Sequence, residues 1–134
     1  MASLIKIEGV GPEYARKMKM LGISTTQALL ERGASPQGRQ EVAEMSGISE
    51  KLILEWVNRA DLFRIKGVGE EYSDLLENAG VDTVVELAQR NAANLFEKMV
   101  AVNQKKKLVR KLPTQAQVEG WISQAKKLPR AVSY

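Results

Sequence analysis

The sequence predicts an all-α protein built from two similar multi-helix halves. Apolar residues recur at helical spacing along most of the chain. Strand-like alternation is nowhere sustained long enough to indicate a sheet. The chain also repeats itself, because residues 4–34 align with residues 62–92 without a gap. The residues that recur 58 positions later are Leu4, Ile7, Gly9, Val10, Gly11, Glu13, Tyr14, Gly22, Thr25, Leu29, Arg32 and Ala34. Such self-similarity indicates an internal duplication.

One insertion distinguishes the second half from the first. The alignment resumes between residues 49–60 and 114–125 and pairs Trp56 with Trp121, but the offset has grown from 58 to 65 positions. The extra residues fall around "VNQKKKLVRKLP", so the insertion coincides with a basic cluster. We therefore predict a first repeat over residues 1–61 and a second over residues 62–134, with the basic insertion near 103–112.

Each predicted helix combines an apolar face with a start or stop residue. The apolar faces are, in chain order, Tyr14, Met18 and Leu21; Ile53, Trp56, Val57 and Ala60; Tyr72, Leu75, Leu76 and Ala79; and Val118, Trp121, Ile122 and Ala125. Starts are indicated by Ser35 before Pro36 and by the capping-box spacings Thr83 to Glu86, Asn94 to Glu97 and Thr114 to Gln117. Ends are indicated by Gly22, Gly47 and Gly80. About eight to ten short helices are expected.

The composition excludes several kinds of site. Without cysteine or histidine, the chain lacks the usual zinc ligands, the thiolate nucleophile and the imidazole acid or base. No acidic spacing is typical of a calcium loop or a two-metal centre. We expect a non-enzymatic protein with no catalytic residues, no cofactor and no metal. The N-terminus does not resemble a secretory signal, and no apolar run reaches the roughly 20 residues of a membrane span. A soluble, cytoplasmic protein with no membrane partner is therefore expected.

Charge is distributed unevenly along the chain. Residues 1–102 carry 12 Lys and Arg against 15 Asp and Glu, a balance of −3. Residues 103–134 carry 8 against 1, a balance of +7. Attraction to a polyanion should therefore centre on the last quarter of the chain.

Two short segments, "IEGVGPEYARKM" and "IKGVGEEYSDLL", resemble the helix-hairpin-helix motif. The pattern consists of Ile7, Gly9, Val10, Gly11 and Ala15 in the first copy and Ile65, Gly67, Val68, Gly69 and Ser73 in the second. In such a turn the glycines accept a positive φ, the valine packs back between the helices, and the next helix begins with free N–H groups that can hold a phosphate. Families with this motif use it to contact the nucleic-acid backbone, independently of sequence.

Residues 4–128 as a whole are similar to an uncharacterised bacterial domain family built from tandem helix-hairpin-helix (SAM-like) units. The resemblance rests on the repeated Gly-Val-Gly, on "GISEKLILEWVNRADLFRI" and "GVDTVVELAQRN", and on "VNQKKKLVRKLP" before a tryptophan-bearing helix. It implies the fold of two tandem units but no defined activity.

Local charge separates the two hairpins. Residues 8–19 sum to +1, whereas residues 66–77 sum to −3 because Glu70, Glu71, Asp74 and Glu77 face a single Lys66. Carboxylates at that position would repel a phosphate, so the second hairpin is predicted to be structural. For the first hairpin both alternatives stay open: a structural turn, or a phosphate contact through Gly9, Val10 and Gly11 with Arg16 and Lys17.

The strongest electrostatic feature is the cluster Lys105, Lys106, Lys107, Arg110 and Lys111. It is either a nucleic-acid contact, which Lys126, Lys127 and Arg130 would extend into one basic surface, or a solvated helix face whose Leu108, Val109 and Leu112 point to the core. The aromatic residues are predicted to be core residues rather than stacking platforms.

Two functions fit these observations. The first is sequence-independent binding of nucleic acid through the first hairpin tip and the basic cluster. The second is a protein-interaction adaptor, or small subunit of a larger assembly, whose basic segment docks an acidic partner. The oligomeric state is left open, and fold alone does not decide between them.

Overall fold

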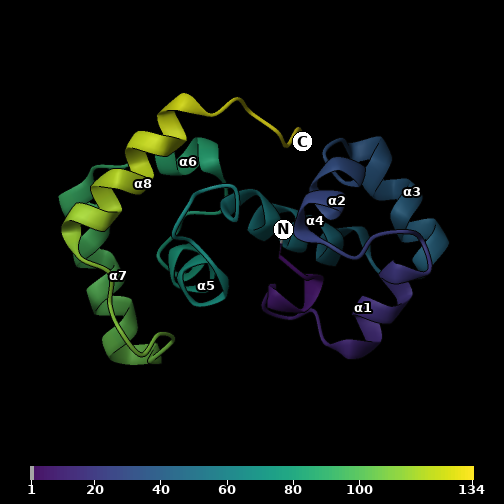
Figure 1. The fold of residues 1–134 in the computed structure, drawn as a ribbon, viewed down its shortest axis with the longest axis horizontal. Coiled ribbons are helices and arrows are strands. Elements are labelled where there is room, and N and C mark those ends of the chain that lie inside the picture. Colours follow the sequence, from purple (N-terminus) through teal and green to yellow (C-terminus); the bar gives the residue numbers. More distant parts are fainter. Residues whose placement is uncertain (1) are drawn as a thin grey trace.

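In the computed structural model, which describes residues 2–134, the chain is all-helical (Figure 1). The elements are the 3₁₀ helix η1 (Leu4–Lys6) and the α-helices α1 (Pro12–Lys19), α2 (Thr26–Arg32), α3 (Pro36–Ser46), α4 (Glu50–Leu62), α5 (Glu70–Asn78), α6 (Val84–Ala88), α7 (Ala92–Lys106) and α8 (Gln115–Lys127). Within the described range there is no strand, and extended pairing is limited to one isolated bridge, between Ser3 and Thr25. The prediction of an all-α protein is confirmed.

Most predicted helix boundaries are confirmed by the caps. The Ser35 hydroxyl accepts the Gly38 N–H at 3.0 Å and Pro36 opens α3. Before α8, Thr114 and Gln117 form the complete capping box. The predicted start at Asn94 is wrong. Asn91, which stands three residues earlier and is an equally good cap, accepts the Asn94 N–H at 3.0 Å, so α7 begins at Ala92.

The apolar residues form two separate clusters. One contains buried residues between Leu4 and Ala60 together with Val132, and the other contains buried residues between Leu62 and Ala125. In Figure 1, α1 to α4 and α5 to α8 lie side by side along the longest axis of the molecule, and α4 runs from the first group toward α5. Each group thus packs its own helices, and α4 leads directly from one core to the other.

Charged side chains fix the joint between the two groups. Arg59 of α4 pairs with Asp74 of α5 at 2.9 Å and also pairs with the carboxylate of Glu77. Burial raises the pKa of Glu77 above its ordinary value of 4.5, against the lowering effect of Arg59. Asp61 accepts the Val84 N–H and an Arg64 N–H, both at 2.8 Å. These contacts hold α5 and α6 against the end of α4.

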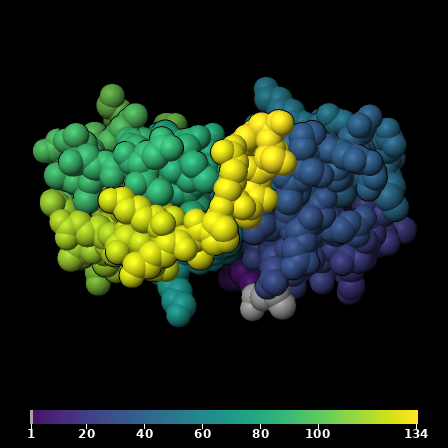
Figure 2. Space-filling model, turned by 90° about the horizontal axis from the view of Figure 1, so that it is seen from above, coloured from purple at the N-terminus to yellow at the C-terminus, as the bar shows by residue number. Residues whose placement is uncertain are grey.

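The segment after α8 returns to the first group (Figure 2). Val132 is 3% exposed and belongs to the first cluster. The Ser133 N–H donates to Ala34 O at 2.8 Å, and the buried Arg39 donates to Ser133 O at 2.7 Å. Burial raises the pKa of the Tyr134 hydroxyl, which donates to Asn58 at 3.0 Å. Residues 128–134 therefore form a second connection between the groups.

Candidate nucleic-acid interface

The first hairpin has an exposed glycine tip. Gly9 is exposed and adopts φ +93°, a conformation that favours glycine. Val10 is 4% exposed, and its N–H donates to Ile7 O at 3.1 Å, which closes the turn. Gly11 precedes α1 without any side-chain cap, and Pro12 occupies the first helical position. The first turn of α1 is therefore not capped by a side chain of the protein.

The second hairpin repeats this turn closely. Gly67 adopts φ +96°, and the Val68 N–H donates to Ile65 O at 3.1 Å. A Cβ on Gly67 would lie 3.1 Å from Nε1 of Trp121, and one on Gly9 would lie 3.5 Å from Nε1 of Trp56. Both glycines therefore have a structural explanation, in the backbone conformation and in the close approach of a tryptophan edge.

The aromatic residues pack behind these turns. The ring centroids of Tyr14 and Trp56 are 5.0 Å apart, and those of Tyr72 and Trp121 are 5.2 Å apart. Trp56 is 1% exposed and Trp121 is 3% exposed. The prediction that the aromatic residues belong to the core is confirmed for both tryptophans, and base stacking on them is excluded in this conformation.

Cations follow the first hairpin along α1. Arg16 and Lys19 are exposed and Lys17 is half-buried. Within the described part of the chain none of the three lies within ion-pair distance of a carboxylate. Glu13 is exposed in the first turn of the same helix. This tip therefore combines open backbone with cations one and two turns further along.

The basic segment, residues 105–111, is only partly helical. Lys105 and Lys106 lie in the last turn of α7, and Lys107 ends the helix with φ +51°. Residues 108–113 form a loop, so the alternative of a solvated helix face does not hold for this part of the segment. The Asn103 side chain explains the ending, because it binds both Val109 N, at 3.0 Å, and Val109 O, at 3.3 Å. Val109 itself is 7% exposed, as the core interpretation predicts.

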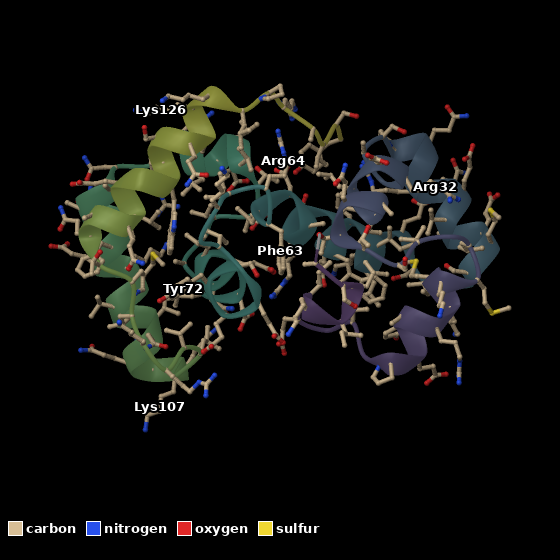
Figure 3. The ribbon with its side chains drawn as sticks, viewed as in Figure 1. Arg32, Phe63, Arg64, Tyr72, Lys107 and Lys126 are labelled. Atoms are coloured by element: carbon tan, nitrogen blue, oxygen red, sulfur yellow. The ribbon has the colours of Figure 1, made fainter. Side chains whose placement is uncertain are left out.

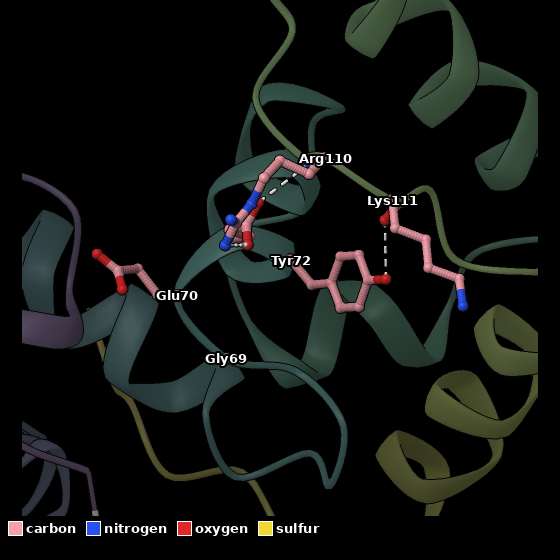
Figure 4. A pocket seen from close by; sticks show the side chains of 6 residues that line it. Gly69, Glu70, Tyr72, Arg110 and Lys111 are labelled. Atoms are coloured by element: carbon pink, nitrogen blue, oxygen red, sulfur yellow. Dashed lines mark hydrogen bonds and ion pairs between the residues drawn. The ribbon is translucent and has the colours of Figure 1, made fainter.

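The loop after α7 rests on the acidic second hairpin (Figure 4). The Tyr72 hydroxyl donates to Lys111 O at 2.9 Å, and the Arg110 N–H donates to Glu71 at 3.2 Å. The Arg110 guanidinium also pairs with Glu71 at 3.6 Å. Together with Gly69 and Glu70 these residues line an open hollow of ≈ 420 Å³. Sequence reasoning treated the acidic hairpin and the basic segment separately, although their opposite charges were a usable signal.

The predicted basic residues do not form one surface. In Figure 3, Lys107 and Lys126 lie at opposite ends of the second group, because α7 and α8 run in opposite directions between them. The expectation that Lys126, Lys127 and Arg130 extend the basic segment is therefore wrong. Lys105, Lys106, Lys107, Arg110 and Lys111 stay together at one end, and all five are exposed. The first hairpin lies in the other group of helices.

Other classes of site leave little trace in residues 2–134. Within that range no three acidic side chains gather as a metal site would require. None of the helices described there is long and apolar enough to cross a membrane.

Comparison with known proteins identifies a family. Neither the curated proteins nor the solved structures contain a significant match. A family model described as a domain of unknown function, DUF4332, matches residues 8–128. That match includes both Gly-Val-Gly turns, the basic segment and all eight α-helices of the described chain. The chain therefore belongs to the DUF4332 family.

Proposed function

We propose that this chain is a cytoplasmic, non-enzymatic protein of two tandem helix-hairpin-helix units that binds the nucleic-acid backbone without strong sequence preference. The two Gly-Val-Gly turns support the tandem organisation, since each has a positive-φ glycine, a buried valine and a tryptophan behind it. The two apolar clusters support a division into residues 1–61 and 62–134, with the insertion near 103–112 in the second unit, except that Val132 of the C-terminal segment packs in the first cluster.

One observation carries the binding proposal: five cations are exposed together on a segment that the fold holds in place. Asn103 fixes the loop to the end of α7, and Tyr72 and Glu71 fix it to α5. A loop that is already ordered loses little conformational entropy when it binds a ligand. Lys105, Lys106, Lys107 and Lys111 have no carboxylate partner within the described chain. Lys106 donates a hydrogen bond to Asn78 at 2.7 Å, and the ammonium groups of the other three are available to phosphates.

The first hairpin supplies a second contact for the same ligand. In the shared view of Figures 1 and 3, α1 and Lys107 both lie toward the lower edge, at opposite sides along the longest axis. A small anion reaches only one of these places, whereas a duplex runs past both. We infer that Gly9, Val10, Gly11, Arg16 and Lys17 contact the backbone at one side and residues 105–111 at the other.

A specific observation also favours the second candidate, a protein-interaction adaptor. Arg110 pairs with the carboxylate of Glu71, so this segment already binds one carboxylate within the chain. The pair is 94% and 45% exposed and is therefore weak enough to be exchanged for a partner's carboxylate. An acidic protein would then bind to the same residues as nucleic acid.

Fluorescence anisotropy with labelled duplex and single-stranded DNA at two salt concentrations tests the proposal. The variant is Lys105→Glu/Lys106→Glu, and the matched control is Lys126→Glu/Lys127→Glu. Both pairs lie in the last turn of a helix, so the charge change and the helix-dipole penalty are the same. If all five cations each neutralise one phosphate, log K falls with log salt at a slope of roughly −4.5.

We expect the variant to weaken binding strongly and to flatten the salt slope by roughly 2, since two phosphate contacts are lost. The control should retain most of the affinity. No binding at low salt, or equal losses in the two variants, would contradict the proposal. In that case, stoichiometric recovery of one acidic protein by the wild type but not by the variant would support the adaptor.

A further inference from the structure

The contact between α4 and α5 shows how one helix of this fold binds the end of another. Arg59, near the end of α4, contacts Asp74 and Glu77, which lie three residues apart on α5. The side chains are only 12%, 15% and 31% exposed, so the contact is largely shielded from water. Ser73 beside them is fully buried. The face of α5 that carries Asp74 and Glu77 therefore binds the positively charged end of a helix.

The first group carries the same face without an occupant. The 58-residue offset places Ala15 where the second group has Ser73, Arg16 at Asp74 and Lys19 at Glu77. These three residues of α1 border an open hollow of ≈ 520 Å³, which Ser3, Leu4 and Ser24 complete. Within residues 2–134, the face of α1 that corresponds to the α4-covered face of α5 borders this hollow, and no α-helix packs closely on that face of α1.

The charges on this face of α1 are opposite to those on the corresponding face of α5. The second group presents carboxylates, which suit the Arg59 guanidinium, whereas the first presents two exposed cations, Arg16 and Lys19. Ser3 and Ser24 stand where the second group has Asp61 and Asp82, so no carboxylate lines the hollow. A ligand that complements the charge of this hollow is therefore negatively charged.

We propose that this face of α1 docks the end of an acidic helix from a protein partner, as α5 docks the end of α4. A carboxylate at the position of Arg59 would lie between Arg16 and Lys19 and would pair with both. This inference goes beyond backbone binding of nucleic acid, because it gives Arg16, which the proposed function places against the backbone, a second ligand that it shares with Lys19: a carboxylate of a partner helix.

A second copy of the chain is a poor occupant. The helix that corresponds to α4 is α8, and the 65-residue offset places Gln124 at the position of Arg59 and Lys126 at that of Asp61. Stacking α8 of one copy on α1 of another would bring a neutral and a positive side chain to Arg16 and Lys19. Like charges at an interface oppose association, so the fitting partner is a different, acidic protein.

Two helix-stapled peptides with the sequence of residues 49–63 test this docking. In both, the core-facing Ile53, Trp56 and Val57 are replaced by glutamine; one keeps Arg59 and the other carries Arg59→Glu. Each is titrated into the full-length ¹⁵N-labelled protein, and amide shifts are followed at Ser3, Lys19 and Ser24. We expect the Arg59→Glu peptide to bind the wild type about tenfold more tightly than the Arg59 peptide, with shifts confined to the hollow.

The charge swap Arg16→Asp/Lys19→Glu recreates the charges of α5 and should reverse this preference. The control Lys6→Glu/Lys17→Glu changes the net charge equally outside the lining of the hollow and should keep it. Absence of binding to the wild type, equal binding of both peptides, or reversal by the control would overturn the inference. So would loss of duplex binding in the charge swap without any peptide binding, which would assign this face to nucleic acid. The Lys105→Glu/Lys106→Glu variant should bind the peptide normally, so failures of the two proposals are distinguishable.

Discussion

Asp61 offers a direct test of how the two groups of helices are held together. Asp61 is only 1% exposed, although its side chain is a carboxylate. One oxygen accepts the Val84 N–H, the first of α6, and the other accepts an Arg64 N–H, both at 2.8 Å. Both bonds are charge-assisted, and they connect the end of α4 to α6.

Asp61→Ala should cost about 3 kcal/mol of the free energy of unfolding, the lower end of the range for breaking a buried ion pair. The lower end applies because the Arg64 side chain is 19% exposed, so water can hydrate part of its guanidinium group when the carboxylate of Asp61 is removed. Asp61→Asn keeps an oxygen for the Val84 N–H but loses the charge, and should cost about 1.5–2 kcal/mol.

Urea unfolding followed by tryptophan fluorescence measures both costs, because Trp56 lies in the first apolar cluster and Trp121 in the second. Glu119→Ala, an exposed site on α8, is the control and should stay within about 0.5 kcal/mol of the wild type. An Asp61→Ala variant as stable as that control would refute the assigned role. Equal costs for Asp61→Ala and Asp61→Asn would show that the Val84 contact contributes nothing.

Three further predictions concern the turns, the joint and the tail. Gly9→Ala and Gly67→Ala should each lower the free energy of unfolding by about 1–2 kcal/mol, because both glycines have a positive φ. The loss should be larger for Gly67→Ala, since the new Cβ would lie closer to a tryptophan, and the urea midpoints of the two variants test this order. Burial raises the pKa of Glu77 in the folded protein, so the unfolded chain loses this proton at a lower pH than the folded chain. The contribution of Glu77 to the free energy of unfolding therefore falls as pH rises from 4.5 through the raised pKa. Glu77→Gln should therefore gain in relative stability over that range in pH-dependent urea titrations. Val132→Ala should cost about 1–2 kcal/mol and lower the transition reported by Trp56 first, since Val132 packs in the first cluster.

Sequence periodicity was sufficient for the helices and their cores. The tryptophans, the buried valines of both hairpins and the caps at Ser35 and Thr114 lie where local patterns predict them. Helix formation and capping depend on neighbours within four residues, so such features are visible in one stretch of sequence. The misplaced start of α7 shows the limit, because Asn91 and Asn94 have the same capping chemistry.

Long-range contacts of single residues could not be predicted in the same way. Val132 is an isolated apolar residue without periodicity, and nothing nearby indicates that it enters the first cluster. The contact between Glu71 and Arg110 joins residues 39 positions apart. Residues 66–77 sum to −3 and residues 103–134 to +7. Charge counted within each segment predicts a structural hairpin and a polyanion partner, but not that Glu71 and Arg110 pair with each other within the protein.

The proposed duplication suggests where function should be sought. Residues identical in both copies, such as Gly9 and Gly67 or Tyr14 and Tyr72, form the turn and pack on the tryptophans. Residues that differ in charge, such as Arg16 against Asp74, lie on the face of α5 that meets α4 and on the face of α1 that borders a hollow. A packing residue must suit the same surroundings in both copies, whereas a surface residue must suit whatever binds there. Because α5 already binds α4, its carboxylates are explained within the chain. The cations of α1 have no carboxylate partner within the described residues, and the docking of a partner's acidic helix that we propose would supply one.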